Sequence, residues 1–344
     1  MLASVLLLSE FKKYLADSDY KYESDVEKRI NDSHSINFTS IYAQNSRGRN
    51  SSNTDEITSI AGIKYNSFWG WQDGKKRNSR DRDVEEPLFM LSHFWKPSSK
   101  TNITTNISYQ FGHIGNSRID FQNAENPDPT YYRNLPSYYT SLYETNQGNI
   151  PSSVYQPGGL GGVLAPDLIG ALNAKFLSTR QIDWDKMYRA NTEFGGYDAN
   201  GNEIRIASQS KYVLYEDRTE DKLLTANTIF NTQLADNVIM NGGFTFRRLN
   251  SANFQYLTDL LGGEFYSDID NFQTGQAQQT DLNNENREVK VGDRFGYNYN
   301  LFANNIDAFT QFKFTYNKID FYLAQSFARK TYQREGLYRN GIYS

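Results

Sequence analysis

The sequence has no cysteine, few prolines and no long hydrophobic run. A chain without cysteine can form neither a disulfide framework nor a thiolate metal site. Its longest aliphatic run, Val5 to Leu8, is far shorter than the ~20 residues that a membrane-spanning helix needs. These absences exclude a disulfide-stapled scaffold and a helical membrane protein.

The sequence is also poor in the signals of nucleic-acid binding, metal binding and catalysis. A net charge of -4 is too small and of the wrong sign to favour nucleic acid. His34, His93 and His113 are scattered, without the spacing of a zinc site or a nucleophile–base pair. The stretch from Asp198 to Glu203 is similar to a calcium loop, but its Asn-Gly pair favours a tight turn. We therefore predict no enzyme activity, no metal and no cofactor.

Aromatic residues are the part of the composition that is in excess. The chain contains 25 Tyr and 22 Phe, and its mean hydropathy is -0.72. Only alternate residues of a barrel strand face lipid, so a membrane-spanning barrel can have a polar average. Aromatic rings are favoured at both membrane interfaces. The composition is therefore compatible with a transmembrane barrel.

Apolar and hydrogen-bonding residues alternate in several segments, most cleanly between Asn102 and Phe111. A period of two indicates an extended strand with two different faces. We predict that the apolar face meets lipid and the polar face a water-filled or plugged lumen. About nine segments fit this pattern: 5–11, 26–30, 34–43, 87–95, 102–111, 224–233, 238–247, 307–316 and 319–330.

Short and long connections between these segments alternate strictly. Short turns are predicted at 31–33, 96–100, 235–237 and 317–318, and long loops at 44–82, 113–210 and 248–305. Outer-membrane barrels have short periplasmic turns and long extracellular loops. The alternation predicts an all-β fold, part of a transmembrane antiparallel β-barrel with long extracellular loops. It directs Asp236 to the periplasm and Asn253 to Gly263 to the outer surface.

Seven stretches carry a resemblance to a known family, and they cover nearly the whole chain in order: 30–37 (INDSHSIN), 65–78 (YNSFWGWQDGKKRN), 109–118 (YQFGHIGNSR), 126–139 (NPDPTYYRNLPSYY), 181–184 (QIDW), 212–217 (YVLYED) and 259–263 (DLLGG). On these stretches the chain resembles the barrel region of TonB-dependent outer-membrane receptors of Bacteroidetes, of the flavobacterial type with a carboxypeptidase-regulatory-like N-terminal domain.

The chain also departs from that family. Nothing in it is similar to the N-terminal plug or the TonB box, or to closing C-terminal strands that end in an aromatic residue. Plugged transporter barrels have ~22 strands, against about nine predicted segments. We therefore expect residues 1–344 to form a partial barrel domain of a larger plugged barrel.

Candidate ligand contacts are aromatic residues of the longest predicted loop. The segment from Asn126 to Tyr139 combines Pro, Tyr and Arg, so it could offer stacking faces and a cation to a ligand. The alternative is that these rings only pack the loop. The candidate residues are Tyr131, Tyr132, Arg133, Tyr138, Tyr139, Trp184 and Tyr188.

Candidate membrane-interface residues are Trp69, Trp71, Phe94 and Trp95, although Trp69 and Trp71 could equally pack a loop. A basic cluster, Lys75 to Arg77 with Arg80 and Arg82, either forms a solvated loop or contacts lipopolysaccharide phosphates near the outer rim.

The resemblance implies an outer-membrane receptor of a Gram-negative cell that takes up a scarce solute. The solute class would be a siderophore, an oligosaccharide or a peptide, and TonB, ExbB and ExbD would supply energy through the plug. Expected partners are the lipid bilayer, lipopolysaccharide, the solute and a lipoprotein lid. The alternatives are a surface adhesin or other soluble β-rich binding protein, and a passive porin.

Overall fold

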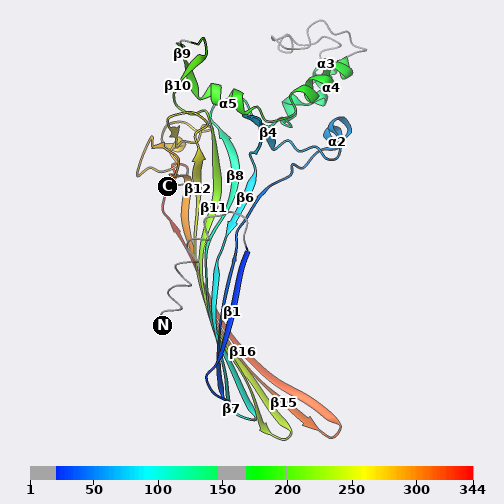
Figure 1. The fold of residues 1–344 in the computed structure, drawn as a ribbon, viewed down its shortest axis with the longest axis vertical. Coiled ribbons are helices and arrows are strands. Elements are labelled where there is room, and N and C mark those ends of the chain that lie inside the picture. Colours follow the sequence, from blue (N-terminus) through cyan, green and yellow to red (C-terminus); the bar gives the residue numbers. More distant parts are fainter. Residues whose placement is uncertain (1–20, 146–167, 199, 344) are drawn as a thin grey trace.

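The computed structural model describes residues 21–145, 168–198 and 200–343. About half of these residues form one antiparallel sheet, whose long strands follow the order β1-β2-β7-β8-β11-β12-β15-β16, with β3 and β6 beside this path (Figure 1). The predicted all-β, antiparallel fold is therefore confirmed. The segment at 5–11 lies outside the described residues.

The sheet strands are β1 (Lys21–Arg29), β2 (His34–Ala43), β3 (Asn45–Gly48), β6 (Asp81–Glu85), β7 (Leu88–Ser98), β8 (Thr101–Phe121), β11 (Tyr212–Ala235), β12 (Val238–Asp259), β15 (Arg294–Tyr316) and β16 (Ile319–Gly336). The connections contain the hairpins β4 (Trp69–Gln72) with β5 (Lys75–Asn78), β9 (Thr192–Tyr197) with β10 (Glu203–Ala207), and β13 (Tyr266–Ser267) with β14 (Glu288–Val289). Their helices are α2 (Asp55–Ala61), η1 (Tyr132–Asn134), α3 (Pro136–Thr145), α4 (Leu168–Ser178), α5 (Trp184–Ala190) and η4 (Gly275–Gln278).

The long strands pair in the order in which they follow one another along the chain, and every pair is antiparallel. Short and long connections therefore fall at opposite ends of the sheet. Figure 1 shows the tight turns at the foot and the helices at the other end. At the first turn, the Asn31 side-chain oxygen accepts hydrogen bonds from the Ser33 and His34 amides. Such a side-chain turn explains why the chain reverses there. The predicted alternation of connections is confirmed.

One strand pair continues past a break without losing register. Ile41 pairs with Leu88 in β2–β7, and Asn45 pairs with Val84 in β3–β6, which is the same register. Pro87, which has no amide to donate, lies at the break. Opposite it, Gly112 has a φ of +136°, and a Cβ there would lie 1.8 Å from the Glu85 carbonyl oxygen. A glycine is therefore required where the backbones approach.

The strands are longer than predicted and the loops shorter. β8 continues to Phe121, β12 to Asp259, and β15 begins at Arg294, inside ranges predicted as loop. The same ranges contain helices α3, α4 and α5. Apolar alternation stops well below the ends of these strands because both faces become polar, while the backbone ladder continues. Lys96 to Ser98 likewise belong to β7 and not to the turn.

Cross-strand register gathers the alternating apolar residues on one face, here called the apolar face. One rung contains Phe38, Leu91, Ile107, Ala226, Phe246 and Ile306. Phe38, Leu91 and Ile107 are 43%, 47% and 50% exposed. Their sequence neighbours form the polar face, where Asn106, Asn227, Thr245 and Asp307 share a rung. The two faces are separated as predicted.

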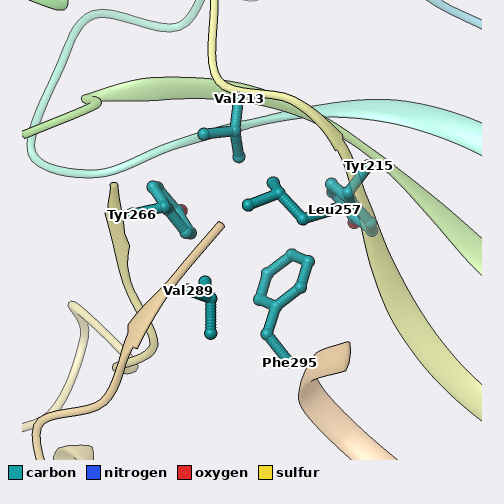
Figure 2. Close-up of a cluster of buried hydrophobic side chains, with 6 residues drawn as sticks. All are labelled: Val213, Tyr215, Leu257, Tyr266, Val289 and Phe295. Atoms are coloured by element: carbon teal, nitrogen blue, oxygen red, sulfur yellow. The ribbon is translucent and has the colours of Figure 1, made fainter. Parts of the chain in front are cut away.

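The fully buried side chains lie at the long-loop end. The loop core consists of Val213, Tyr215, Leu257, Tyr266, Val289 and Phe295. Figure 2 shows these side chains directed toward one another. A second cluster contains Ile182, Trp184, Met187, Tyr212 and Leu261, and a third contains Ile57, Tyr65, Leu135 and Phe176. The long connections are therefore packed structures.

Among the residues that the structure describes, no helix is both long and apolar enough to cross a membrane.

Candidate functional site

The polar face near the short turns is a ladder of hydrogen-bonded side chains. Asn106 donates to Asn227 at 2.8 Å, and Asn37 donates to Asp25 at 2.6 Å. Asn231 donates to Asn241 on the next strand. Side chains of this kind satisfy one another across strands and can also bind water. This face therefore carries most of the hydrogen-bonding side chains of the sheet, with Ile229, Ile239 and Phe309 as apolar exceptions.

Toward the loops, the polar face carries charges and tyrosines. The Arg118 guanidinium on β8 pairs with Asp217 on β11 at 2.9 Å, and the Tyr297 hydroxyl donates to the same carboxylate at 3.1 Å. Burial raises the pKa of Tyr297, and the adjacent Asp217 adds to the effect. At this site Asp217 accepts from two elements that are far apart in the sequence.

A cavity of about 460 Å³ lies above this rung, between the end of β8, β12, β13 and the start of β15. Asp120, Gln255 and Tyr266 line it. Burial raises the pKa of Asp120, while hydrogen bonds from Tyr266 and from the Phe121 amide oppose that rise. A carboxyl and a phenol therefore face one small space, next to the loop core of Figure 2.

The loop after β12 is fixed beside this cavity by a buried ion pair. The Asp268 carboxylate pairs with Arg287 and accepts a hydrogen bond from the Gly296 amide at 2.8 Å. Arg287 also donates to the Tyr338 hydroxyl. A buried carboxylate with these two partners is satisfied, so its role is to hold the loop in position.

The predicted ligand residues of the Tyr-rich segment come together, but on an arm and not on the sheet. The ring pairs Tyr131–Tyr132, Tyr132–Tyr138 and Tyr138–Tyr139 lie 4.7, 5.5 and 5.5 Å apart, edge to face. The Arg133 guanidinium donates to the Tyr132 hydroxyl and lowers the pKa of that phenol. In Figure 1, α3 and α4 project beyond the long-loop end of the sheet.

Trp184 and Tyr188 lie in α5 and hold loops together. Trp184 is fully buried, and the Arg77 guanidinium stacks on its ring at 4.4 Å. Arg77 also pairs with Asp259 at 2.6 Å and donates to the Tyr188 hydroxyl at 3.4 Å. Arg77 therefore joins three elements: its own β4–β5 hairpin, helix α5 and the end of β12. The sequence had suggested only that Arg77 belongs to a basic cluster.

The candidate interface residues fall in three settings. Trp95 is on the apolar face near a short turn, and its ring stacks on His34. Phe94, its neighbour, is on the polar face, opposite Thr104. Trp69 and Trp71 belong to the β4–β5 hairpin in the loops, where Lys76 lies over the Trp69 ring at 4.5 Å.

Two histidines that looked unrelated in the sequence are in contact. The β2–β7 register brings His34 Nδ1 to 3.0 Å from His93 Nε2. The prediction that the three histidines are scattered is wrong for His34 and His93, because strand register brings them together across 59 positions of sequence.

Within residues 21–145, 168–198 and 200–343, no group of three or more His, Cys, Asp or Glu residues is arranged to hold a metal ion. Asp198 instead accepts from the amides of Asn200 and Asn202, as a turn residue does.

Comparisons with known proteins give little at the level of sequence. No family model matches the chain, and no curated protein sequence matches it. Among solved structures, the ferric-catecholate import receptor Fiu from E. coli K12, in an open form, aligns with 10% identity and a TM-score of 0.38. The alignment covers 92% of this chain and 37% of that one, so the chain spans little more than a third of that receptor's length.

Proposed function

We propose that the chain forms part of the barrel wall of an outer-membrane receptor that takes up a scarce solute by TonB-coupled transport, of the type found in Bacteroidetes. The observation that carries this proposal is the band of apolar residues on one face of the sheet. On β11 the band runs from Leu224 to Thr232, on β12 from Val238 to Phe246, and on β16 from Ile319 to Phe327. Above it the same face carries Lys222, Arg248 and Arg329.

The height of the band fits a bilayer. Each stretch has nine residues, which at ~3.3 Å per residue span ~30 Å along the strand. With a tilt of ~35–45°, the band is ~21–25 Å tall, close to the height of the lipid-facing belt in outer-membrane barrels. The rest of each strand would extend beyond the outer leaflet.

The charges above the band suit the outer interface. Arg248 and Arg329 are exposed and end the apolar alternation of their strands. Guanidinium groups there can bind lipopolysaccharide phosphates while their stems cover hydrocarbon. We assign the lipopolysaccharide contact to these residues, because Arg80 and Arg82 lie on the polar face. Trp95 is the interface residue at the opposite end.

The ligand would enter from the long-loop side and meet the polar face. Exposed Tyr132 and Arg133, with the partly exposed rings of Tyr131, Tyr138 and Tyr139, are proposed as first contacts on the arm, where a lipoprotein lid could also dock. Trp184 and Tyr188 are proposed to hold the loops around Arg77 in place. Energy from TonB, ExbB and ExbD through a plug is part of the proposal and rests on the resemblance of the sequence.

Epitope tags test the proposed topology. A tag at exposed Gly201, in the β9–β10 hairpin, should be stained on intact Gram-negative cells, and a tag between Asp236 and Asn237 only after the outer membrane is permeabilised. Recovery of the chain in a soluble fraction, with neither tag protected, would favour the adhesin alternative. A steady open conductance of the whole protein in planar bilayers would favour the passive porin.

A further inference from the structure

Arginines converge on the polar face where β3, β6 and β8 run side by side. Arg47 pairs across strands with Arg82, and the Arg49 amide donates to the Arg80 carbonyl on the next rung. Opposed residues in an antiparallel pair point to the same face. Arg118 on β8 follows Asn116, the partner of Arg82, and so extends the group. We call Arg47, Arg49, Arg80, Arg82 and Arg118 the arginine wall.

Within the described residues four of these five arginines form no ion pair, although Glu86 lies near enough to Arg82, and Asp128 and Asp217 to Arg80, for their charges to interact. Arg118 pairs with Asp217, but within the described residues the guanidinium groups of Arg47, Arg49 and Arg82 form no ion pair or hydrogen bond. Arg80 lies over the Phe68 ring at 5.4 Å. Asp81 and Asp83 alternate with Arg80 and Arg82 along the chain and therefore point to the other face.

Without a bound anion, this arrangement of arginines destabilises the folded state. Like charges directly opposite one another destabilise a strand pair. Burial, with help from the adjacent Arg118, lowers the pKa of Arg80, and the nearby Tyr215, Asp128 and Asp217 only partly oppose this. An anion bound between these guanidinium groups would neutralise their repulsion.

We infer that the arginine wall binds the acidic groups of a small polyanionic solute, with Arg47 and Arg82 as the central pair. This inference rests on the proposed uptake function and adds its substrate class. Neighbouring strands are ~4.8 Å apart and alternate residues on a strand ~6.8 Å apart. Guanidinium pairs with this spacing fit a ligand whose carboxylate or phosphate groups are ~5–7 Å apart, each held bidentately.

Binding of citrate and of 2,3-bisphosphoglycerate to the detergent-solubilised chain, measured by calorimetry, tests the inference. The double variant Arg47→Gln/Arg82→Gln should weaken binding by at least ~10-fold, since each removes charge-assisted hydrogen bonds. The matched control Lys222→Gln/Lys290→Gln removes the same charge at two sites away from the arginine wall and should change affinity by less than ~2-fold. Arg82→Lys keeps the charge but loses the bidentate guanidinium, so its affinity should lie between those of the two double variants.

Several results would overturn the inference: no binding of either probe by the unchanged chain, equal losses in the two double variants, or binding of lipopolysaccharide alone. The epitope test separates this failure from failure of the proposed function. If the tag at Gly201 is displayed on the cell surface but neither probe binds, only the anion-binding role of the arginine wall is contradicted. If the probes bind through the arginines but the tag is not displayed, only the proposed uptake function is contradicted.

Discussion

The two halves of the long strands obey different rules. Near the short turns, β8 and β11 alternate strictly, with Ile107 and Ala226 on the apolar face and Asn106 and Asn227 on the other. Nearer the loops the same strands carry charge on both faces, with Glu216 and Arg218 on one and Arg118 and Asp217 on the other. The backbone ladder is continuous through both halves, so the halves differ in side-chain chemistry and not in pairing. One half carries the apolar band that we propose faces hydrocarbon, and the other is polar on both faces.

The largest effect should come from a charge placed in the apolar band. Ile107→Arg should lower the free energy of unfolding from phosphatidylcholine vesicles by about 2–4 kcal/mol, the cost of arginine at the bilayer midplane. Ser108→Arg, the next residue on the polar face, and Ala252→Arg, on the apolar face above the band, should each cost less than about 1 kcal/mol. Equal losses of unfolding free energy in all three variants would contradict the proposed difference between the apolar band and the rest of the strand.

In the loop half, the largest effect should come from buried Asn191. Its amide donates to the carbonyls of Tyr212, Leu260 and Leu261, and its carbonyl accepts from the amides of Lys211 and Tyr212. Asn191→Ala should cost about 2–3 kcal/mol of local stability by orphaning these groups. Hydrogen exchange should then speed up at 188–212 and 257–263 but not in the apolar band. Exposed Asn202→Ala is the control, and unchanged exchange in the first variant would contradict the prediction.

A smaller effect is expected at Arg77. Arg77→Ala removes the ion pair with Asp259 and the stacking on Trp184, together worth about 1–2 kcal/mol when partly buried. Exchange should increase in α5 and the β4–β5 hairpin, while Lys75→Ala, in the same hairpin, should leave both unchanged. If Arg77→Ala also left them unchanged, the three connections would be joined by something other than this side chain.

The smallest effect should come from a polar pair inside the apolar band. The hydroxyls of Thr105 and Thr228 lie 2.9 Å apart. Replacing both by Val removes donor and acceptor together, so unfolding in vesicles should change by no more than about 0.5 kcal/mol. Thr105→Val alone leaves the Thr228 hydroxyl unpaired and should cost about 1 kcal/mol. A larger loss in the double variant would contradict a hydrocarbon-facing pair.

The sequence predicted the lower half of the sheet well because alternation there has one cause. Ile103 to Phe111 on β8 and Ile319 to Phe327 on β16 alternate because one face is apolar, and the described strands contain both segments. The continuation of β8 to Phe121 was missed because Arg118 and Asp120 are polar residues in an extended chain, which looks the same as a loop. Nothing in local composition distinguishes the two.

The site was predictable only where its residues are close in the sequence. Tyr131, Tyr132 and Arg133 touch because they are adjacent. The pairs Arg47–Arg82 and His34–His93 depend on strand register across long connections, which no local pattern reveals. Arg77 was grouped correctly by charge, but its partners Asp259 and Trp184 come from distant elements.

Depth measurements along β11 test the central claim most directly. The chain has no cysteine, so single Cys substitutions from Arg218 to Thr232 can each carry a spin label without background. Collision rates with oxygen, which partitions into lipid, and with a water-soluble nickel chelate should alternate from residue to residue between Leu224 and Thr232. Oxygen should be favoured at Leu224, Ala226 and Thr228, and the chelate at Thr225 and Asn227. Above Lys222 the alternation should disappear, with the chelate favoured on both faces. A profile without alternation below Lys222, or with alternation continuing to Arg218, would contradict the account.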